Sequence, residues 1–294
     1  MQKKLICAIF VTYNCDEEFY NCFKRIYRKV DKVVIVDNGS NAETLNTLND
    51  IRLNNDIELI LNEENLGIAT ALNRGVKYAI DNNYEWVITL DHDSKVTENM
   101  IDKMFEQYNE INEEVRKKIV SIVPNYIEES LADQYNEKSI ENDYEFVETG
   151  ITSGNIVKVS IFKEIGLFEE KLFIDCVDNE FCCRIIKNGY KILQVNNAIL
   201  LHNLGEVKVF RFFGKEIRCS NHSYIRRYYI TRNRLFVWNR YKNITPNFIK
   251  LDKISSIKEL VKIILFEKDK LLKLRMILKG YHDYKNNIYG KINI

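Results

Sequence analysis

The 294-residue chain has few of the residues that interrupt regular structure, with only 2 prolines and 11 glycines. This scarcity argues against a disordered or linker-rich protein, and no internal repeat or low-complexity tract is visible. Long apolar runs are also missing, since none approaches the roughly 20 residues that span a bilayer. The run at residues 5–11 is short and lacks a small-residue cleavage site, so we interpret it as a buried strand rather than a signal peptide.

The seven cysteines lack the paired C-x-x-C spacing of zinc ribbons and redox motifs. Seven is also an odd number, and free thiols in a reducing compartment are the ordinary interpretation of such a set. With 46% hydrophobic residues, the chain can fill the core of one large α/β domain with an appendage. We therefore expect a cytoplasmic protein.

The net charge of +1 conceals an uneven distribution. From Gly205 onward there are 21 Lys and Arg against 7 Asp and Glu, which leaves 22 against 35 for the preceding residues. The chain thus has an acidic front and a basic tail, and we predict a first domain at residues 1–205 and a second at 206–294. A basic tail indicates an anionic partner, which can be phosphate, nucleic acid or a lipid surface.

Apolar segments alternate with amphipathic segments through the first part of the chain. We predict strands at residues 5–11, 32–36, 57–61 and 86–90, and helices at 17–29, 42–54 and 68–82. Strands that are separated by single helices form right-handed βαβ units and a parallel sheet. The sequence therefore predicts an α/β fold in which ligands bind beyond the carboxyl ends of the strands.

The later segments are shorter. We predict a helix at residues 99–118, a polar excursion at 128–143, helices starting near 160 and 178, and strands at 119–123, 145–149, 155–159, 191–195 and 198–202. From about residue 210 the pattern predicts helices that are rich in aromatic and basic residues.

Polar clusters follow the predicted strands at the edge where ligands bind. Thr12 and Asn14 follow the first strand, and Asp37 follows the second at the head of Asp37-Asn38-Gly39-Ser40. These side chains can line a nucleoside pocket, with Asp37 accepting hydrogen bonds from a base or ribose. Capping of the next helix by Asp37 or Ser40 is the structural alternative.

Asn65, Gly67 and Asn73 lie at and after the start of the predicted helix at 68–82. Gly67 permits close approach of a ligand to the backbone, and the helix N-terminus that follows favours phosphate. Tight packing of the helix on the sheet is the alternative explanation for the small residues here.

Asp91-His92-Asp93 directly follows an apolar strand. Two carboxylates at a strand end can hold a hard divalent cation whose shell is completed by diphosphate oxygens and water. Such a cation would neutralise charge on a departing diphosphate. Solvated carboxylates in a turn are the alternative. His202, which follows the apolar segment 198–201, is a further candidate metal ligand if the fold brings it to the aspartate pair.

Three carboxylates surround the start of the predicted helix near residue 178: Asp175, Asp178 and Glu180. An acid at a helix N-terminus is stabilised in its ionised form by the helix dipole and the free backbone amides. A general base needs this form near neutral pH. Helix capping by Asp178 is the structural alternative.

In order and spacing, these segments resemble the family 2 glycosyltransferases of GT-A fold, particularly the bacterial rhamnosyltransferases. The resemblance implies a Rossmann-like, mixed and mostly parallel sheet flanked by helices, with a C-terminal helical extension. It also implies a Mg²⁺ or Mn²⁺ ion held by the Asp91-His92-Asp93 motif, with His202 completing the site as in some relatives, and a nucleotide diphosphate sugar as donor. Within the rhamnosyl branch this donor is dTDP-rhamnose, and UDP-linked galactofuranose or GlcNAc remain alternatives.

The same resemblance assigns individual roles. Asp178 matches the catalytic base of an inverting transfer, Asp175 and Glu180 lie on the acceptor side, and Gly154 matches a small-residue turn near the donor sugar. The remaining donor-binding positions that it implies are Thr12, Asn14, Asp37, Asn65, Gly67, Asn73 and Asp91. Two positions depart from the family pattern: Val177 stands where many members have an acid, and Leu72 where many have an arginine.

The basic tail resembles the segment that follows the catalytic domain in rhamnosyltransferases. Aromatic and aliphatic side chains against lipid, with Lys and Arg at anionic headgroups, suit peripheral membrane association and a lipid-linked or glycan acceptor. We expect no nucleic acid partner, although a basic aromatic run can bind one. An ordinary helical packing unit is the structural alternative.

Two other classes share parts of this pattern. A nucleotidyltransferase usually has a Gly-rich, basic triphosphate loop near the first strand, and residues 12–18 contain no Gly, Lys or Arg. A non-catalytic sugar-nucleotide-binding protein would keep the fold but lose the base or the metal pair, whereas Asp91, Asp93 and Asp178 are all present.

Overall fold

The computed structural model describes residues 5–129, 142–202, 208–212 and 214–292. Its contacts divide the chain into two compact units. The sheet unit comprises Met1–Glu170 and Val177–Asn203, and the helical unit comprises Lys171–Cys176 and Leu204–Ile294. The short segment Lys171–Cys176 thus belongs to the helical unit although the sheet unit flanks it in sequence.

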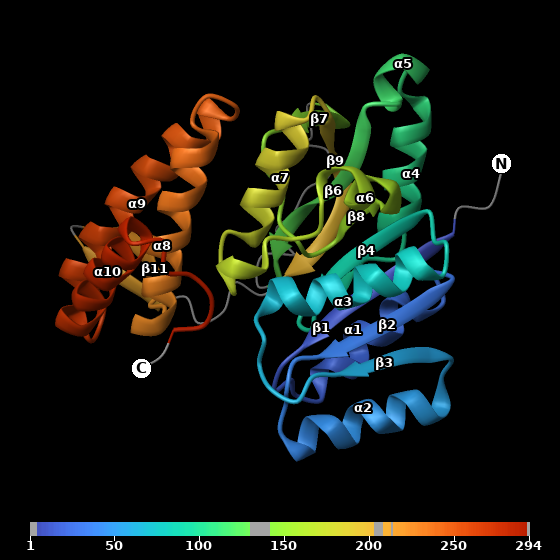
Figure 1. Ribbon diagram of the computed structural model, residues 1–294, viewed down its shortest axis with the longest axis horizontal. Helices are drawn as coiled ribbons and strands as arrows, with labels where there is room; N and C mark the ends of the chain where they lie inside the picture. Colours follow the sequence, from blue (N-terminus) through green and yellow to red (C-terminus); the bar gives the residue numbers. More distant parts are fainter. Residues whose placement is uncertain (1–4, 130–141, 203–207, 213, 293–294) are drawn as a thin grey trace. The chain divides into compact units, whose positions relative to one another are not determined.

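A nine-stranded mixed sheet forms the centre of the sheet unit (Figure 1). Its strand order is β3-β2-β1-β4-β8-β6-β9-β5, with β7 paired to β9. The register makes β1, β2, β3, β4, β6 and β9 point one way and β5, β7 and β8 the other. The strands are β1 (Ile6–Thr12), β2 (Lys32–Asp37), β3 (Ile57–Leu61), β4 (Trp86–Asp91), β5 (Lys95–Val96), β6 (Ile119–Glu128), β7 (Tyr144–Val147), β8 (Asn155–Lys158) and β9 (Lys191–His202).

Helices of the sheet unit cover the sheet with apolar faces. In α1 the side chains of Phe19, Cys22, Phe23 and Ile26 are buried at the three- and four-residue spacing of a single helix face. Asn41 caps the next helix, because its side chain accepts a hydrogen bond from the Thr44 amide at 3.0 Å. The helices are α1 (Glu18–Tyr27), α2 (Ala42–Asn54), α3 (Ile68–Asp81), α4 (Met100–Glu110), α5 (Glu113–Arg116), α6 (Val159–Ile165) and α7 (Val177–Lys187).

The sheet unit differs from the sequence prediction in two places. The helix predicted at 99–118 is divided into α4 and α5, because the Asn112 side chain accepts from the Glu114 amide at 2.9 Å and starts a new helix. The two strands predicted at 191–195 and 198–202 are one strand, β9. Pro124 pairs with Val195 and Asn125 with Ile199, so a bulge absorbs the polar residues between them. Of the polar excursion predicted at 128–143, residues 130–141 lie outside the described part.

The helical unit contains a hairpin followed by three helices. The hairpin of β10 (Lys208–Phe212) and β11 (Lys215–Cys219) was missed, because the tail was predicted to be helical from about residue 210. Gly214 has φ of +74°, a backbone angle that glycine adopts readily and that suits a tight turn between the strands. The helices are α8 (Tyr224–Tyr241), α9 (Pro246–Phe266) and α10 (Lys270–Lys285).

Buried charges join these three helices. Arg227 of α8 pairs with Glu267 at 2.9 Å, and Lys273 of α10 pairs with the same carboxylate at 2.8 Å. Gly280 of α10 packs against α8 so closely that a Cβ there would lie 2.6 Å from the Tyr228 carbonyl oxygen. Among the described residues, no helix is both long and apolar enough to cross a membrane.

Candidate active site

The carboxyl ends of β1, β2, β3 and β4 meet at one edge of the sheet, which we call the carboxyl edge. The register pairs Thr12 with Asp37 and Val11 with Asp91, so these strand ends are aligned across three neighbouring strands. Polar residues follow each of them. The register thus places Thr12, Asp37 and Asp91 at one edge, and their roles in binding stay predictions.

Asp37 organises the turn after β2. Its carboxylate accepts hydrogen bonds from the Thr12 hydroxyl at 3.0 Å, the Gly39 amide at 3.1 Å, the Ser40 amide at 2.9 Å and the Ser40 hydroxyl. Both Thr12 and Asp37 are 0% exposed. This geometry does not favour the predicted direct contact of Asp37 with a nucleoside, because both carboxylate oxygens are engaged within the protein.

Asn14 ties the loop after β1 to the loop after β2. Its amide N–H donates to the Ser40 hydroxyl at 2.9 Å, and its side-chain oxygen accepts from the Asn41 amide at 2.9 Å. The residue has φ of +48° and is exposed. Asn14 is thus both a link between the two loops and a side chain that a ligand at the carboxyl edge can reach.

A second set of amides joins the loop after β2 to the loop after β3. The Asn38 side chain donates to the Asn65 side-chain oxygen at 3.1 Å and accepts from the Asn62 side chain at 3.0 Å and the Leu66 amide at 3.0 Å. Asn65 in turn accepts from the Gly67 amide at 2.9 Å. Asn38 and Asn62 were not predicted as site residues, although both directly follow a strand.

Two glycines permit these loops to come together. Gly39 has φ of +79°, and a Cβ there would lie 2.5 Å from the Glu64 carbonyl carbon. Gly67, with φ of +88°, directly precedes α3. Only glycine adopts such backbone angles without steric cost, so the loop approach depends on both residues.

The Asp91-His92-Asp93 turn ends β4 at the same edge, and all three residues are half-buried. The Ser94 amide donates to the Asp91 carbonyl at 3.2 Å, and the Asp91 amide donates to the Ser153 hydroxyl at 3.1 Å. Ser153 also donates to the Ser94 hydroxyl at 2.6 Å. The backbone of the turn is therefore held from both ends.

A hard divalent cation fits this turn as far as its donor chemistry goes, since both carboxylates supply oxygen ligands. Within the described residues, no group of three or more His, Cys, Asp and Glu side chains is placed to hold a metal ion. That a diphosphate and water supply the other ligands of such a cation stays a prediction. His202 ends β9, and its side chain lies outside the described part.

Gly154 lies beside Asp91 in the turn before β8. Its amide donates to the Thr89 carbonyl at 2.8 Å, and its φ is +76°. A Cβ at this position would lie 2.8 Å from Cγ of Pro124. The predicted small-residue turn is thus next to the aspartate turn, and its lack of a side chain is required by packing.

Asp178 belongs to the same edge. It lies in the first turn of α7, and α7 ends at Lys187, shortly before β9 begins at Lys191. Because β9 points the same way as β4, the end of α7 lies at the amino ends of these strands and its start at their carboxyl ends (Figure 1). The connectivity therefore brings Asp178 to the edge that carries Asp91 and Asp93.

Contacts around Asp178 agree with this placement. The Asn179 amide donates to the Asp178 carboxylate at 2.7 Å. One turn further along α7, the Cys182 thiol donates to the Gly150 carbonyl at 3.6 Å. Gly150 shortly precedes the turn that contains Gly154, so the first part of α7 adjoins that turn.

Glu180 has a structural partner rather than an open position. Its side chain is 1% exposed and pairs with Arg184 at 2.7 Å. Arg184 also donates to the Ile165 carbonyl at 2.8 Å. The predicted acceptor-side role of Glu180 is not favoured, because the carboxylate is buried in the attachment of α7 to the end of α6.

Asn73 likewise faces the protein interior. Its side-chain nitrogen donates to the Phe168 carbonyl at 2.9 Å and the Glu170 carboxylate at 2.8 Å, and its oxygen accepts from the Phe168 amide at 2.9 Å. The residue is 1% exposed. The predicted donor contact is replaced by a clamp that holds the chain at residues 168–170.

Asp175 lies in the helical unit, where it pairs with Arg226 at 3.1 Å. Its other carboxylate oxygen is buried and has no hydrogen-bond partner among the described residues. Burial raises the pKa of Asp175, and the charge of Arg226 opposes this rise. Its predicted position on the acceptor side stays a prediction.

Comparisons with known proteins identify the fold and the family. A family model described as glycosyl transferase family 2 matches residues 7–164, which is more than half of the chain. The chain belongs to this family. Residues 7–164 include the strand ends that carry Thr12, Asp37, Asp91 and Gly154, and they end before Asp178.

Among curated relatives, the dTDP-rhamnosyl transferase RfbF of Shigella flexneri is 28% identical over 258 residues, which cover 85% of this chain and 84% of the relative. The low-salt glycan biosynthesis hexosyltransferase Agl10 of Haloferax volcanii is 26% identical over 210 residues, which cover 67% of each protein. The sequence similarity to RfbF confirms the predicted resemblance to bacterial rhamnosyltransferases.

Solved structures confirm the predicted GT-A fold. The mannosyltransferase PcManGT from Pyrobaculum calidifontis, in complex with GDP-Man and Mn²⁺, aligns with a TM-score of 0.60 and 13% identity over 97% of this chain and 76% of that one. The chain spans less than half of two other structural neighbours, 44% of GalNAc-T7 and 49% of S. aureus TarS.

Proposed function

We propose that this family 2 glycosyltransferase is an inverting enzyme that moves L-rhamnose from dTDP-rhamnose to a hydroxyl of a bacterial cell-surface polysaccharide or lipid-linked glycan. The observation that carries the inverting mechanism is that Asp178 and the Asp91-Asp93 turn lie at one edge of the sheet. The similarity to RfbF supports the donor.

In this mechanism Asp178 accepts the proton of the acceptor hydroxyl while the hydroxyl oxygen attacks the anomeric carbon. The bond from the anomeric carbon to the diphosphate breaks, and the nucleoside diphosphate leaves with the electron pair. Attack from the face opposite the leaving group inverts the anomeric configuration. A Mg²⁺ or Mn²⁺ ion held by Asp91 and Asp93, with His202 as a further predicted ligand, would neutralise charge on the leaving diphosphate.

The loops at the carboxyl edge suit the nucleoside of the donor. Their hydrogen bonds through Asp37, Asn38 and Asn65 fix the backbone before a ligand binds. Asn14 is exposed at this edge and is a candidate for direct contact with the nucleotide. Thr12, Asp37, Asn65 and Asn73 then act by positioning the backbone.

A donor screen tests this function. The full chain is incubated with Mn²⁺ and dTDP-rhamnose, UDP-galactofuranose or UDP-GlcNAc, and both the melting temperature and the release of nucleoside diphosphate are measured. We expect stabilisation and turnover with dTDP-rhamnose, because a ligand that binds only the folded state raises the melting temperature. Selective stabilisation by a UDP-sugar would replace the donor, and release of pyrophosphate from a nucleoside triphosphate would indicate a nucleotidyltransferase.

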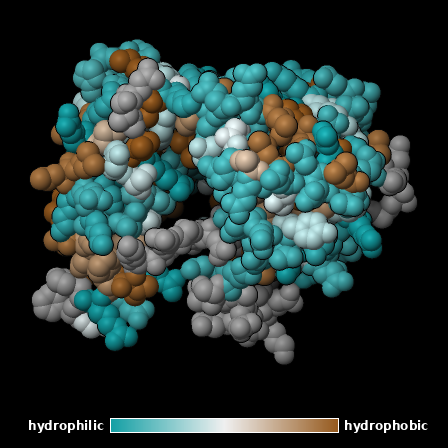
Figure 2. Space-filling model, turned by 90° about the horizontal axis from the view of Figure 1, so that it is seen from below, coloured by the Kyte–Doolittle hydropathy of each residue, from teal (hydrophilic) through white to brown (hydrophobic). Residues whose placement is uncertain are grey.

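We further propose that α9 binds an anionic membrane surface. Leu251, Ile257 and Ile264 are 66%, 64% and 47% exposed, whereas Ile249 and Ile263 of the same helix are buried. Figure 2 shows apolar residues on the surface of the helical unit.

Positive charge beside these apolar side chains favours an anionic membrane as their partner. Lys250, Lys253 and Lys258 are exposed on the same helix. A helix with exposed aliphatic side chains and flanking lysines matches acyl chains and anionic headgroups together. Peripheral association of this kind would bring the enzyme to a lipid-linked acceptor.

We expect the substitution of Ile257 and Ile264 by Gln to weaken binding to phosphatidylglycerol-containing vesicles by about tenfold or more, since each apolar side chain contributes roughly 1–2 kcal/mol. Cosedimentation measures the binding. Leu53→Gln is the control, because Leu53 is 78% exposed on α2 of the sheet unit. Equal binding by the double variant would contradict the assignment, as would a wild-type chain that forms dimers but ignores vesicles.

A further inference from the structure

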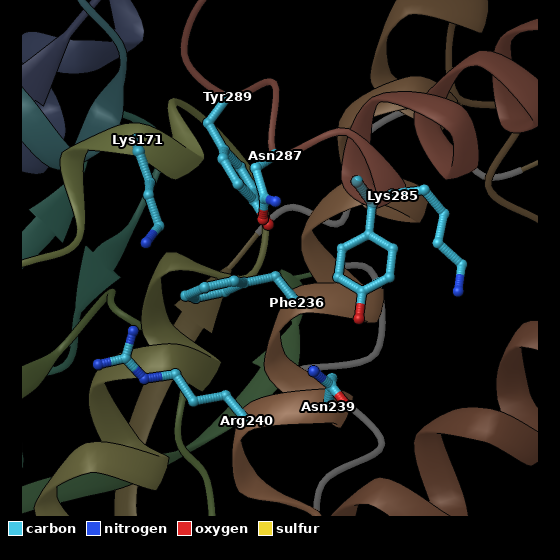
Figure 3. A pocket seen from close by; sticks show the side chains of 8 residues that line it. Lys171, Phe236, Asn239, Arg240, Lys285, Asn287 and Tyr289 are labelled. Atoms are coloured by element: carbon cyan, nitrogen blue, oxygen red, sulfur yellow. The ribbon is translucent and has the colours of Figure 1, made fainter.

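A cavity of about 480 Å³ lies within the helical unit (Figure 3), and none of the predicted donor-binding residues lines it. One wall is the end of α8, with Phe236 and Arg240. A second wall is the end of α10 and the segment after it, with Tyr284 and Tyr289. Lys171 closes a third side. The volume is within the roughly 300–1,000 Å³ of small-molecule sites.

The lining of this cavity is cationic and aromatic. Of the described residues that line it, three are basic, Lys171, Arg240 and Lys285, and none is acidic. Figure 3 shows Lys171 above and Arg240 below the ring of Phe236. Lys171 Nζ is 4.3 Å and Arg240 Cζ is 5.5 Å from the centre of this ring. Two positive charges therefore lie near one aromatic ring.

The remaining lining suits a saccharide. The rings of Phe236 and Tyr289 meet edge to face with centres 5.6 Å apart. Such half-buried rings can pack against the C–H groups of a sugar ring, while the amides of Asn239 and Asn287 can bind hydroxyls.

Arg232 connects two walls of the cavity through hydrogen bonds. It is 0% exposed, and its guanidinium donates to the Gly290 carbonyl at 2.8 Å and the Leu172 carbonyl at 3.0 Å. The Gly290 amide also donates to the Lys171 carbonyl at 2.8 Å. One buried side chain of α8 thus connects the segment after α10 with the segment that contains Lys171, so the cavity is preformed.

We infer that this cavity binds a phosphate-bearing saccharide, with Lys171 and Arg240 at the phosphate and the aromatic rings at the sugar. Phosphate forms strong charge-assisted hydrogen bonds with such cations, and the absence of acids from the described lining avoids repulsion. Its use as an acceptor subsite, for a glycan linked through phosphate or diphosphate, rests on the proposed function.

Titration calorimetry on the full chain tests the site, with α-D-glucose 1-phosphate as the probe. We expect Lys171→Gln combined with Arg240→Gln to raise the Kd by about tenfold or more, because each charged hydrogen bond contributes roughly 1.5–3 kcal/mol. The control is Lys250→Gln combined with Lys268→Gln, which removes the same charge from exposed positions outside the cavity. An unchanged Kd in the first variant, or an equal rise in the control, would overturn the inference.

Two further arms identify what is bound. Phe236→Leu is expected to weaken glucose 1-phosphate more than inorganic phosphate, and neutral glucose should bind more weakly than glucose 1-phosphate. If Phe236→Leu leaves both affinities unchanged, the saccharide part of the inference fails. Binding of dTDP with Mn²⁺ is measured in the same variants and should be retained, so failure of the cavity and failure of the proposed donor site give different results.

Discussion

Asp178→Asn is expected to lower transfer by about 10²–10⁴-fold, the usual contribution of a general base. Asn has nearly the same shape as Asp but cannot accept the proton of the acceptor hydroxyl. Donor affinity should be unchanged, because the base acts on the acceptor. Initial rates of glycan formation and calorimetric titration with dTDP measure the two quantities separately.

Asp50→Asn is the matched control. Asp50 is exposed on α2, so this substitution removes the same charge elsewhere in the sheet unit. Equal loss of transfer in both variants would point to a general effect of charge. Normal transfer by Asp178→Asn would exclude this residue as the base.

Asp93→Asn is expected to lower transfer by about 10²–10³-fold, in the range found when one electrostatic contact to a transition state is lost. The variant keeps the size of the side chain but removes one charged oxygen ligand. We also expect it to abolish the additional thermal stabilisation that Mn²⁺ gives to the complex with dTDP. Rate measurements and thermal unfolding, each with Mn²⁺ and with EDTA, check both effects.

In the wild-type chain EDTA should reproduce the loss caused by Asp93→Asn, and in the variant EDTA should have little further effect. Asp102→Asn serves as a control because Asp102 is exposed at the start of α4. If EDTA abolished transfer while Asp93→Asn retained full activity, the cation would have to be held by other residues.

The alternation of apolar and amphipathic segments was sufficient to predict the order of strands and helices up to β4. Residues 32–36 became β2 because their continuous β-branched run is buried on both faces of the sheet. Residues 57–61 became β3, which lies at the sheet edge and is mostly half-buried. The hairpin of β10 and β11 was not predicted, since basic and aromatic residues alternate there without a continuous apolar run. The bulge in β9 depends on its pairing with β6, which local sequence does not encode.

Within the candidate site, the sequence located polar positions better than it assigned their roles. Asp37 and Asn73 were predicted to contact the donor, yet each binds other parts of the protein. A polar residue after a strand can serve a ligand or a neighbouring loop, and spacing along the chain does not distinguish them. The partners of Asn73 lie 95 and 97 residues away, so only the folded chain reveals them.

The segment Lys171–Cys176 has a consequence for the exchange of domains between relatives. Asn233 of α8 donates to the carbonyl groups of Leu172, Ile174 and Asp175, and Arg226 pairs with Asp175. A chimera joined only near residue 205 would separate α8 from the peptide that it evolved to hold. A graft of the tail from another enzyme would therefore have to bring its own counterpart of this segment, inserted just ahead of Asp178.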